Sequence, residues 1–126
     1  MAKLISLPNY SDDRGSLTVL DDIEKLLPFK VNRIFYIYNV DDSVRGGHRH
    51  HKTVQAAICI KGSCVVSNND SIAKEEFLLD SPSKCLILET YDWHQMHSFT
   101  PDAIFLVFAS EVYNADDYIY EPYPEV

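Results

Sequence analysis

Two histidines that lie two residues apart, His48 and His50, are the first side chains in the sequence whose types and spacing suit chemistry. In a β-strand, side chains two positions apart project from the same face, so one small cavity can hold both rings. An imidazole titrates near neutral pH and can therefore take and return a proton, or bind a divalent metal. His94 follows later in an apolar and aromatic context that suits a neighbouring strand. Gln55 has the opposite parity and joins this face only if a bulge or bend intervenes.

The histidine pair lies in a basic stretch of an acidic chain. The net charge is −8, and the octet from Arg45 to Lys52 carries three positive charges and no acid, so the remainder carries −11. An acidic protein is a poor nonspecific binder of nucleic acid, because such binding needs a basic surface. Cations gathered around histidines indicate a small anionic ligand, although a solvated basic loop would give the same pattern.

The composition is that of one globular domain. With 126 residues, 46% apolar and 24% charged, the chain is long enough for one hydrophobic core. We therefore expect a single domain over residues 1–126. No apolar run reaches the length of a membrane span, and the first ten residues lack the pattern of a signal peptide, so we expect a cytoplasmic protein without membrane contact. Three cysteines in apolar runs, Cys59, Cys64 and Cys85, are expected to be reduced core thiols.

Short apolar or β-branched runs, separated by turn formers, predict an all-β sandwich or barrel. Residues 20–27 alone have a helical pattern, which Pro28 ends. The runs 33–40 and 103–109 are apolar on both faces, as expected of walls packed between two layers or against a subunit partner. The acidic, tyrosine-rich tail of residues 111–126 is expected to pack on the domain or on a partner. The other predicted strands are residues 16–20, 54–60, 64–67, 77–79 and 85–88.

The spacing around the histidine pair resembles a known motif. Gly47-His48-x-His50, followed by Gln55 and Gly62, is similar to the first cupin motif, and Trp93-His94 stands where the second cupin motif places its histidine. Cupins are small jelly-roll β-barrels. The resemblance therefore implies an all-β single cupin domain with at most one short helix, which agrees with the strand pattern.

Further segments, in consistent order over nearly the whole chain, extend this resemblance. They are Asp13-Arg14-Gly15-Ser16-Leu17, Arg45-Gly46, Asp80-Ser81-Pro82, Trp93-His94, Met96-His97, Ala109-Ser110 and Asp117-Tyr118-Ile119. Together they resemble the dTDP-sugar 3,4-ketoisomerases, small cupins that convert dTDP-4-keto-6-deoxyglucose to its 3-keto isomer. The implied ligand is a dTDP-linked 4-keto-6-deoxyhexose, and the implied assembly is a homodimer. The product would supply a transaminase that makes a 3-amino sugar for surface polysaccharide or glycoprotein glycans.

The resemblance also implies roles for particular residues. Moving a ketone from C4 to C3 requires removal of the C3 proton, an enediol intermediate and delivery of a proton to C4, and His48 and His50 suit this acid–base work. No electrons leave the substrate, so we expect no metal and no organic cofactor. Tyr36 is expected to act with the histidines as a donor to the charged intermediate. The chain has no glycine-rich phosphate loop, so arginines are expected to grip the diphosphate. The expected substrate-binding residues are Arg14, Arg33, Arg45, Gln55, Trp93 and His94.

Three other functions remain open. A metal-dependent cupin, such as a dioxygenase, would bind a divalent cation through the three histidines and a carboxylate. Here Gln55 occupies the carboxylate position, and Tyr91 replaces the glycine expected before the last histidine. A non-catalytic cupin would bind a sugar or nucleotide without turnover. A 3,5-epimerase usually needs a His–Asp pair, and no aspartate partner is obvious, since Asp116 and Asp117 are expected to form caps and turns.

The chain departs from the ketoisomerase pattern at several positions. Arg49 separates the paired histidines where these enzymes usually have a small side chain, and His51 replaces a lysine-like position. Tyr120 stands where an arginine is usual. These changes spare the paired histidines but leave open the exact substrate and the configuration at C4. We expect His51 and His97 to be structural.

Overall fold

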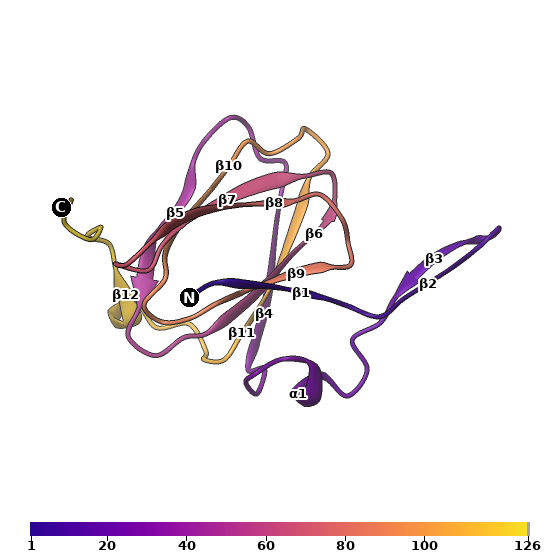
Figure 1. Ribbon diagram of the computed structural model, residues 1–126, viewed down its shortest axis with the longest axis horizontal. Coiled ribbons are helices and arrows are strands. Elements are labelled where there is room, and N and C mark those ends of the chain that lie inside the picture. Colours follow the sequence, from indigo (N-terminus) through magenta and orange to yellow (C-terminus); the bar gives the residue numbers. More distant parts are fainter. Residues whose placement is uncertain (126) are drawn as a thin grey trace.

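Two five-stranded antiparallel sheets face one another in the computed structural model, which describes residues 1–125 (Figure 1). The order in the first sheet is β1 (Lys3–Ser6), β9 (Lys84–Leu88), β6 (Gln55–Lys61), β11 (Ile104–Ala109) and β4 (Arg33–Tyr38). The order in the second is β12 (Tyr118–Ile119), β5 (Arg45–His50), β10 (Trp93–His97), β7 (Cys64–Asn69) and β8 (Lys74–Leu79). The predicted all-β architecture is therefore confirmed.

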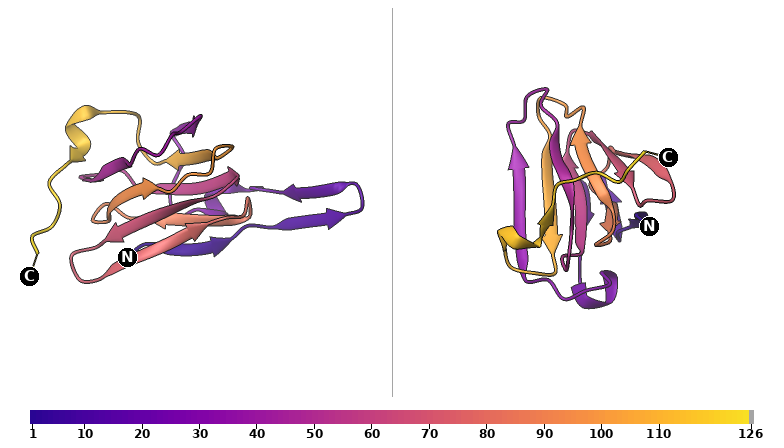
Figure 2. Two further views of the ribbon diagram at one scale, coloured as in Figure 1. Left: turned by 90° about the horizontal axis from the view of Figure 1, so that it is seen from above. Right: turned by 90° about the vertical axis from the view of Figure 1, so that its left-hand side faces the viewer.

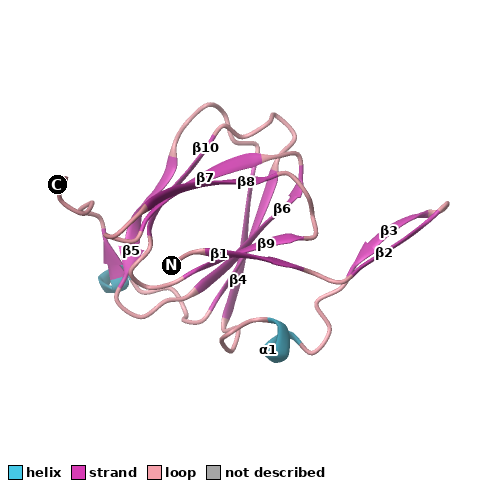
Figure 3. Cartoon of the chain, viewed as in Figure 1, coloured by secondary structure: helices cyan, strands magenta, loops and turns pink. Residues whose placement is uncertain are grey.

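Within residues 1–125, helical structure is confined to two single turns (Figure 3). The α-helix α1 (Ile23–Leu26) lies inside the predicted range and ends two residues before Pro28. A 3₁₀ turn, η1 (Ala115–Asp117), precedes β12 and is capped by the Asn114 side chain. None of the helices in residues 1–125 is long and apolar enough to cross a membrane.

Apart from its edge strand β4, the first sheet is apolar on both faces, and both faces are covered. Its inner face packs against the second sheet through residues such as Phe105, Val107 and Leu86. Its outer face is covered by α1 and the segments that flank it, where Leu27 is 1% exposed. The expectation for residues 103–109 is confirmed. The three cysteines are free and buried, as predicted.

The edge strand β4 differs from the rest of its sheet. Its residues alternate between half-buried and exposed, so that Phe35 and Ile37 face inward whereas the opposite side of the strand is open. The residues on this open side are Ile34, Tyr36 and Tyr38, which are 58%, 62% and 58% exposed. An apolar stripe on an edge strand thus has no cover within residues 1–125.

A hairpin formed by β2 (Asn9–Asp12) and β3 (Gly15–Thr18), here called the arm, projects away from both sheets (Figures 1 and 2). A hydrogen bond from Leu7 N to Ser83 O joins the chain just before the arm to the body, and one from Val19 N to Pro8 O closes the base of the hairpin. Beyond this base the arm is exposed, including Tyr10 and Leu17 at 65% and 60%.

The tyrosine-rich tail packs on the domain, as expected. It leaves β12 and crosses the outer face of the second sheet, where the Trp93 indole donates to Tyr120 O at 3.2 Å. The Tyr123 hydroxyl donates to Tyr91 O at 2.7 Å, and the Arg49 guanidinium lies 4.8 Å from the Tyr123 ring centroid.

Candidate active site

The glycines before the histidine pair set the register of β5 against β10. Gly46 and Gly47 have φ values of 83° and 81°, a region that favours glycine. A Cβ on Gly46 would lie 3.0 Å from both the carbonyl oxygen of His94 and the Met96 sulfur. The register shifts at this point, with His48 opposite His94 but Gly46 opposite Gln95. The bulge thereby brings two distant histidines side by side.

Three histidine rings meet between the two sheets. The ring centroids of His48 and His50 are 4.9 Å apart, those of His48 and His94 are 5.0 Å apart, and the third pair is 6.2 Å apart. One ring nitrogen from each residue lies within 4.8 Å of the other two. His48 and His94 line the cavity described below, whereas His50 lies behind them and is 3% exposed.

The ring of His50 is held by an aspartate. Its Nδ1 lies 3.0 Å from Asp117 Oδ2. Asp117 also accepts hydrogen bonds from Lys52 N at 2.7 Å and from the Thr53 hydroxyl. Because a carboxylate only accepts, His50 carries its proton on Nδ1, and the buried Nε2 has no partner within residues 1–125. The expectation that Asp117 serves only in a turn, and that no aspartate pairs with the histidines, is thus wrong.

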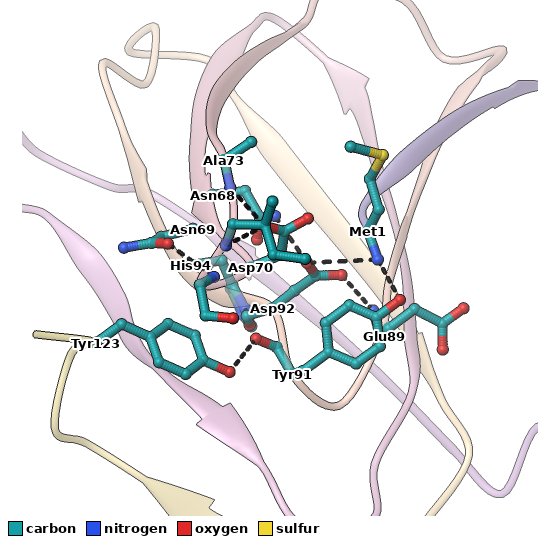
Figure 4. Close-up of polar contacts among 12 residues, drawn as sticks. Met1, Asn68, Asn69, Asp70, Ala73, Glu89, Tyr91, Asp92, His94 and Tyr123 are labelled. Atoms are coloured by element: carbon teal, nitrogen blue, oxygen red, sulfur yellow. Dashed lines mark hydrogen bonds and ion pairs between the residues drawn. The ribbon is translucent and has the colours of Figure 1, made fainter. Parts of the chain in front are cut away.

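His94 is held by its own loop (Figure 4). Its Nδ1 lies 3.0 Å from the carbonyl oxygen of Asp92, which leaves Nε2 free. The Asp92 carboxylate is fully buried and accepts from Asn68 Nδ2 and Glu89 N, both at 2.8 Å, while the Met1 ammonium lies 4.0 Å away. These contacts fix the loop from which His94 enters β10.

Burial keeps all three imidazoles neutral. It lowers the pKa of His48 to about 4, and the neighbouring His94 ring acts in the same direction. Burial and His48 lower the pKa of His50 to about 4, although Asp117 opposes them, and burial also lowers the pKa of His94 to about 4. The pKa of Asp117 falls below its ordinary value because hydrogen bonds from Thr53, Lys52 N and His50 together outweigh its desolvation. At neutral pH the site therefore holds three free bases and one carboxylate.

A cavity of about 250 Å³ opens in front of His48 and His94. Pockets that bury drug-sized ligands start at about 300 Å³, so this cavity has the scale of a sugar ring and not of a nucleotide sugar. Arg33, Arg45 and Gln55 contribute its polar wall together with the histidines, and no acidic side chain from residues 1–125 lines it. The remaining wall is Tyr118 and apolar residues of both sheets. Such a lining suits an anionic or oxygen-rich ligand.

Six of the predicted site residues thus lie together: His48, His50, His94, Arg33, Arg45 and Gln55. Gln55 reaches the cavity from the opposite wall because the chain bends over residues 51–54 from β5 into β6 of the other sheet, which meets the condition set for Gln55. No bulge within one strand is needed.

The other three lie elsewhere. Tyr36 faces outward because its neighbours Phe35 and Ile37 face the cavity. Trp93 lies on the outer face of the second sheet for the same reason, one residue from His94, and bonds to the tail. Arg14 lies at the tip of the arm, where it pairs with Asp12 at 2.8 Å. Thr53, Asp117 and Tyr118 also lie at the site and were not predicted, although Asp117-Tyr118 was among the segments of the resemblance.

The donor set bears on the metal-dependent alternative. Three neutral imidazoles can hold a divalent ion such as zinc. The cavity residue at the position of a fourth metal ligand is Gln55, whose neutral amide is a weaker ligand than a carboxylate. The histidines therefore fit a metal, and the fourth ligand fits it poorly.

Comparison with known proteins points to the same family as the sequence resemblance. Residues 1–124 match the family described as FdtA, WxcM-like, C-terminal. The chain belongs to this family. It is 37% identical over 118 residues to the TDP-4-oxo-6-deoxy-α-D-glucose-3,4-oxoisomerase of Aneurinibacillus thermoaerophilus, covering 93% of this chain and 84% of that protein.

Solved structures give the same result for this FdtA-family chain. The sugar 3,4-ketoisomerase QdtA from Thermoanaerobacterium thermosaccharolyticum, in complex with TDP, matches with a TM-score of 0.90 and 34% identity, covering 95% of this chain and 88% of that one. The RmlC epimerase of Mycobacterium tuberculosis matches with a TM-score of 0.79 at 15% identity, covering 93% of this chain and 66% of that one, which shows the shared cupin-type fold alone. The predicted family and fold are confirmed.

Proposed function

We propose that this protein is a 3,4-ketoisomerase that moves the keto group of a dTDP-linked 4-keto-6-deoxyhexose from C4 to C3. The observation that carries the proposal is the cluster of three neutral histidines at the wall of a sugar-sized cavity that also holds two arginines. The identity of the relatives supports the substrate class. A variant of QdtA with one histidine changed to asparagine has been solved with TDP-4-keto-6-deoxyglucose, and it is 33% identical to this chain.

His48 is the base in this proposal. It lines the cavity and is neutral at pH 7, so it can take the C3 proton of a sugar whose C4 ketone acidifies that position. The electron pair of the C3–H bond forms a C3–C4 double bond, and the C4 oxygen becomes an enediolate. The hydroxyl proton then passes from the C3 oxygen to the C4 oxygen. The imidazolium exchanges its proton with solvent and then delivers a proton to C4 as the C3 ketone forms, so the reaction is a balanced isomerisation without a cofactor.

His50 supports this proton transfer from behind. Its ring contacts His48 edge-on, and Asp117 fixes its tautomer so that Nε2 is the free acceptor. A base next to His48 can share the proton while the enediolate exists. Arg33, Arg45, Gln55 and His94 are proposed to hold the sugar and the nearer phosphate.

A homodimer completes the site in this proposal. An isolated two-stranded hairpin is marginal in water, and the arm exposes Tyr10 and Leu17, so it needs a surface to pack on. The exposed stripe on β4 is also uncovered. A second copy of the chain supplies both surfaces at once, as a self-complementary interface does. It would also bring Arg14 to a partner's ligand, since the cavity is too small for the nucleotide.

The proposed pathway and location follow from the chemistry. A 3-keto sugar nucleotide is the substrate that a transaminase needs to make a 3-amino sugar for a surface polysaccharide or glycan. Sugar nucleotides and three free thiols both suit the cytoplasm.

One observation favours a second function, 3,5-epimerisation. The His50–Asp117 pair is the arrangement that was expected to be missing, and an epimerase also begins by removing the C3 proton. The two reactions differ in outcome, because a 3,5-epimerase inverts C3 and C5 and leaves the ketone at C4. NMR of the sugar product separates them directly.

Site variants test the assignment of the base. We expect His48→Asn to lower kcat by about 10³-fold, within the range for general acid–base catalysis. His50→Asn should lower it less, because that ring does not line the cavity. His51→Asn is the matched control, since this exposed ring should leave the rate unchanged. A His48→Asn protein with near-normal turnover would contradict the assignment.

A further inference from the structure

One tyrosine side chain that was not among the expected site residues forms part of the cavity wall. Of all the tyrosines in residues 1–125, only Tyr118 lines the cavity. It lies in β12 directly opposite His50 in β5, so it is a cross-strand neighbour of the histidine pair. Its ring centroid is 4.7 Å from that of His48 and 4.7 Å from that of His50.

The proton of this phenol is available to a ligand. Arg33 Nη1 donates to the Tyr118 oxygen at 3.5 Å, and a guanidinium has no acceptor, so the phenol oxygen is the acceptor in this contact. No other hydrogen bond of this hydroxyl occurs within residues 1–125. Tyr118 therefore lines the same cavity as His48, and the Arg33 guanidinium contacts its hydroxyl oxygen.

The ring is fixed in this position by its neighbours. Tyr113 and Tyr120 pack on it with centroid separations of 5.8 and 6.1 Å, and the tail beyond it is tied to Trp93. Arg33 is itself fixed by contacts with Phe35 and Tyr113. A donor held in advance of the reaction stabilises developing charge without reorganisation.

We propose that Tyr118, and not Tyr36, is the catalytic phenol, which hydrogen-bonds to the enediolate and relays the hydroxyl proton from the C3 oxygen to the C4 oxygen. The inference rests on the proposed ketoisomerase function. In the relay Tyr118 gives its proton to the C4 oxygen and takes one from the C3 oxygen, so the phenol is regenerated. The Arg33 guanidinium stabilises the phenol oxygen while the two protons move.

The test follows turnover and hydrogen exchange together in deuterated water, with dTDP-4-keto-6-deoxyglucose and full-length protein. Tyr118→Phe keeps the ring and its packing, and we expect kcat to fall about 100-fold, as for loss of one oxyanion donor, while KM changes by less than about threefold. His48 still removes the C3 proton in this variant. More of the enediolate should then return to starting ketone, so the ratio of C3-deuterated substrate to 3-keto product should rise.

Tyr120→Phe is the matched control, since it removes a phenol outside the cavity and keeps the ring that packs on Tyr118, and it should behave as wild type. The relay is overturned if Tyr118→Phe keeps kcat within about threefold of wild type, or is slow with an unchanged exchange ratio. A wild-type protein that neither exchanges nor isomerises would instead overturn the ketoisomerase function itself.

Discussion

At the scale of single residues, the site depends on imidazoles that are kept neutral by burial. A base must be unprotonated to act, so the pKa of His48 in the free enzyme sets the acid limb of kcat/KM. Burial lowers that pKa from 6.5 to about 4. We therefore expect kcat/KM to stay level down to about pH 5 and to fall only near pH 4. A fall centred near pH 6.5 would show that His48 is solvated.

The same shift carries a cost for stability at low pH, which serves as the control for this profile. Between pH 6.5 and 4 these histidines are protonated in the unfolded chain but stay neutral in the folded protein. The free energy of unfolding should therefore fall as the pH drops from 6.5 to 4. Thermal unfolding measured at each pH identifies the range in which the rates report on folded protein.

Asp117 offers a second test at this scale. The Asp117 carboxylate holds the Nδ1 proton of His50 and raises the pKa of that ring. Asp117→Asn removes this negative charge. We expect kcat to fall about 10- to 100-fold with KM little changed, because loss of an orienting carboxylate misplaces the imidazole tautomer. Asp116→Asn, which changes the exposed neighbour, should have no effect on kcat. Equal effects of the two variants on initial rates would contradict a specific role for Asp117.

At the scale of elements, the close approach of β5 to β10 can be tested through two adjacent glycines. Both have positive φ, so alanine at either position costs on the order of 1–2 kcal/mol of backbone strain. A Cβ at Gly46 also meets the His94 carbonyl at 3.0 Å, whereas a Cβ at Gly47 meets nothing closer than 3.8 Å. Gly46→Ala should therefore lower the melting temperature and kcat more than Gly47→Ala. Indistinguishable variants would show that the bulge does not set the histidine register.

The elements also show what the sequence could and could not predict. Apolar runs identified four strands of the first sheet but only β7 and β8 of the second. The spacing of His48 and His50 correctly put their rings together. Tyr36 and Trp93 were expected in the cavity, but each is one residue away from a position that faces inward. The inward positions are Phe35 and His94. Asp117 lies 67 residues from His50, and only the folded chain joins them. The polar β2 and the two-residue β12 have no apolar pattern from which to predict them.

At the scale of the whole molecule, the arm and the open side of β4 predict a dimer. Sedimentation should give twice the 14.4 kDa mass of the chain. Leu17→Asp places a charge on the arm where Leu17 is 60% exposed, and it should shift the protein toward monomer and raise KM for the nucleotide sugar. Ile72→Asp is the control, because Ile72 is 92% exposed in the turn between β7 and β8. A wild-type monomer with full activity would contradict this assembly.

Metal-free acid–base isomerisation at the histidine cluster can be tested in one experiment. The most direct measurement incubates chelator-treated, metal-free protein with dTDP-4-keto-6-deoxyglucose in deuterated water and follows the sugar ring by NMR, with His48→Asn alongside. We expect a 3-keto product carrying deuterium at C4, formed by the metal-free protein and lost in the variant. An unchanged spectrum, or turnover that returns only when a divalent metal is added, would contradict it.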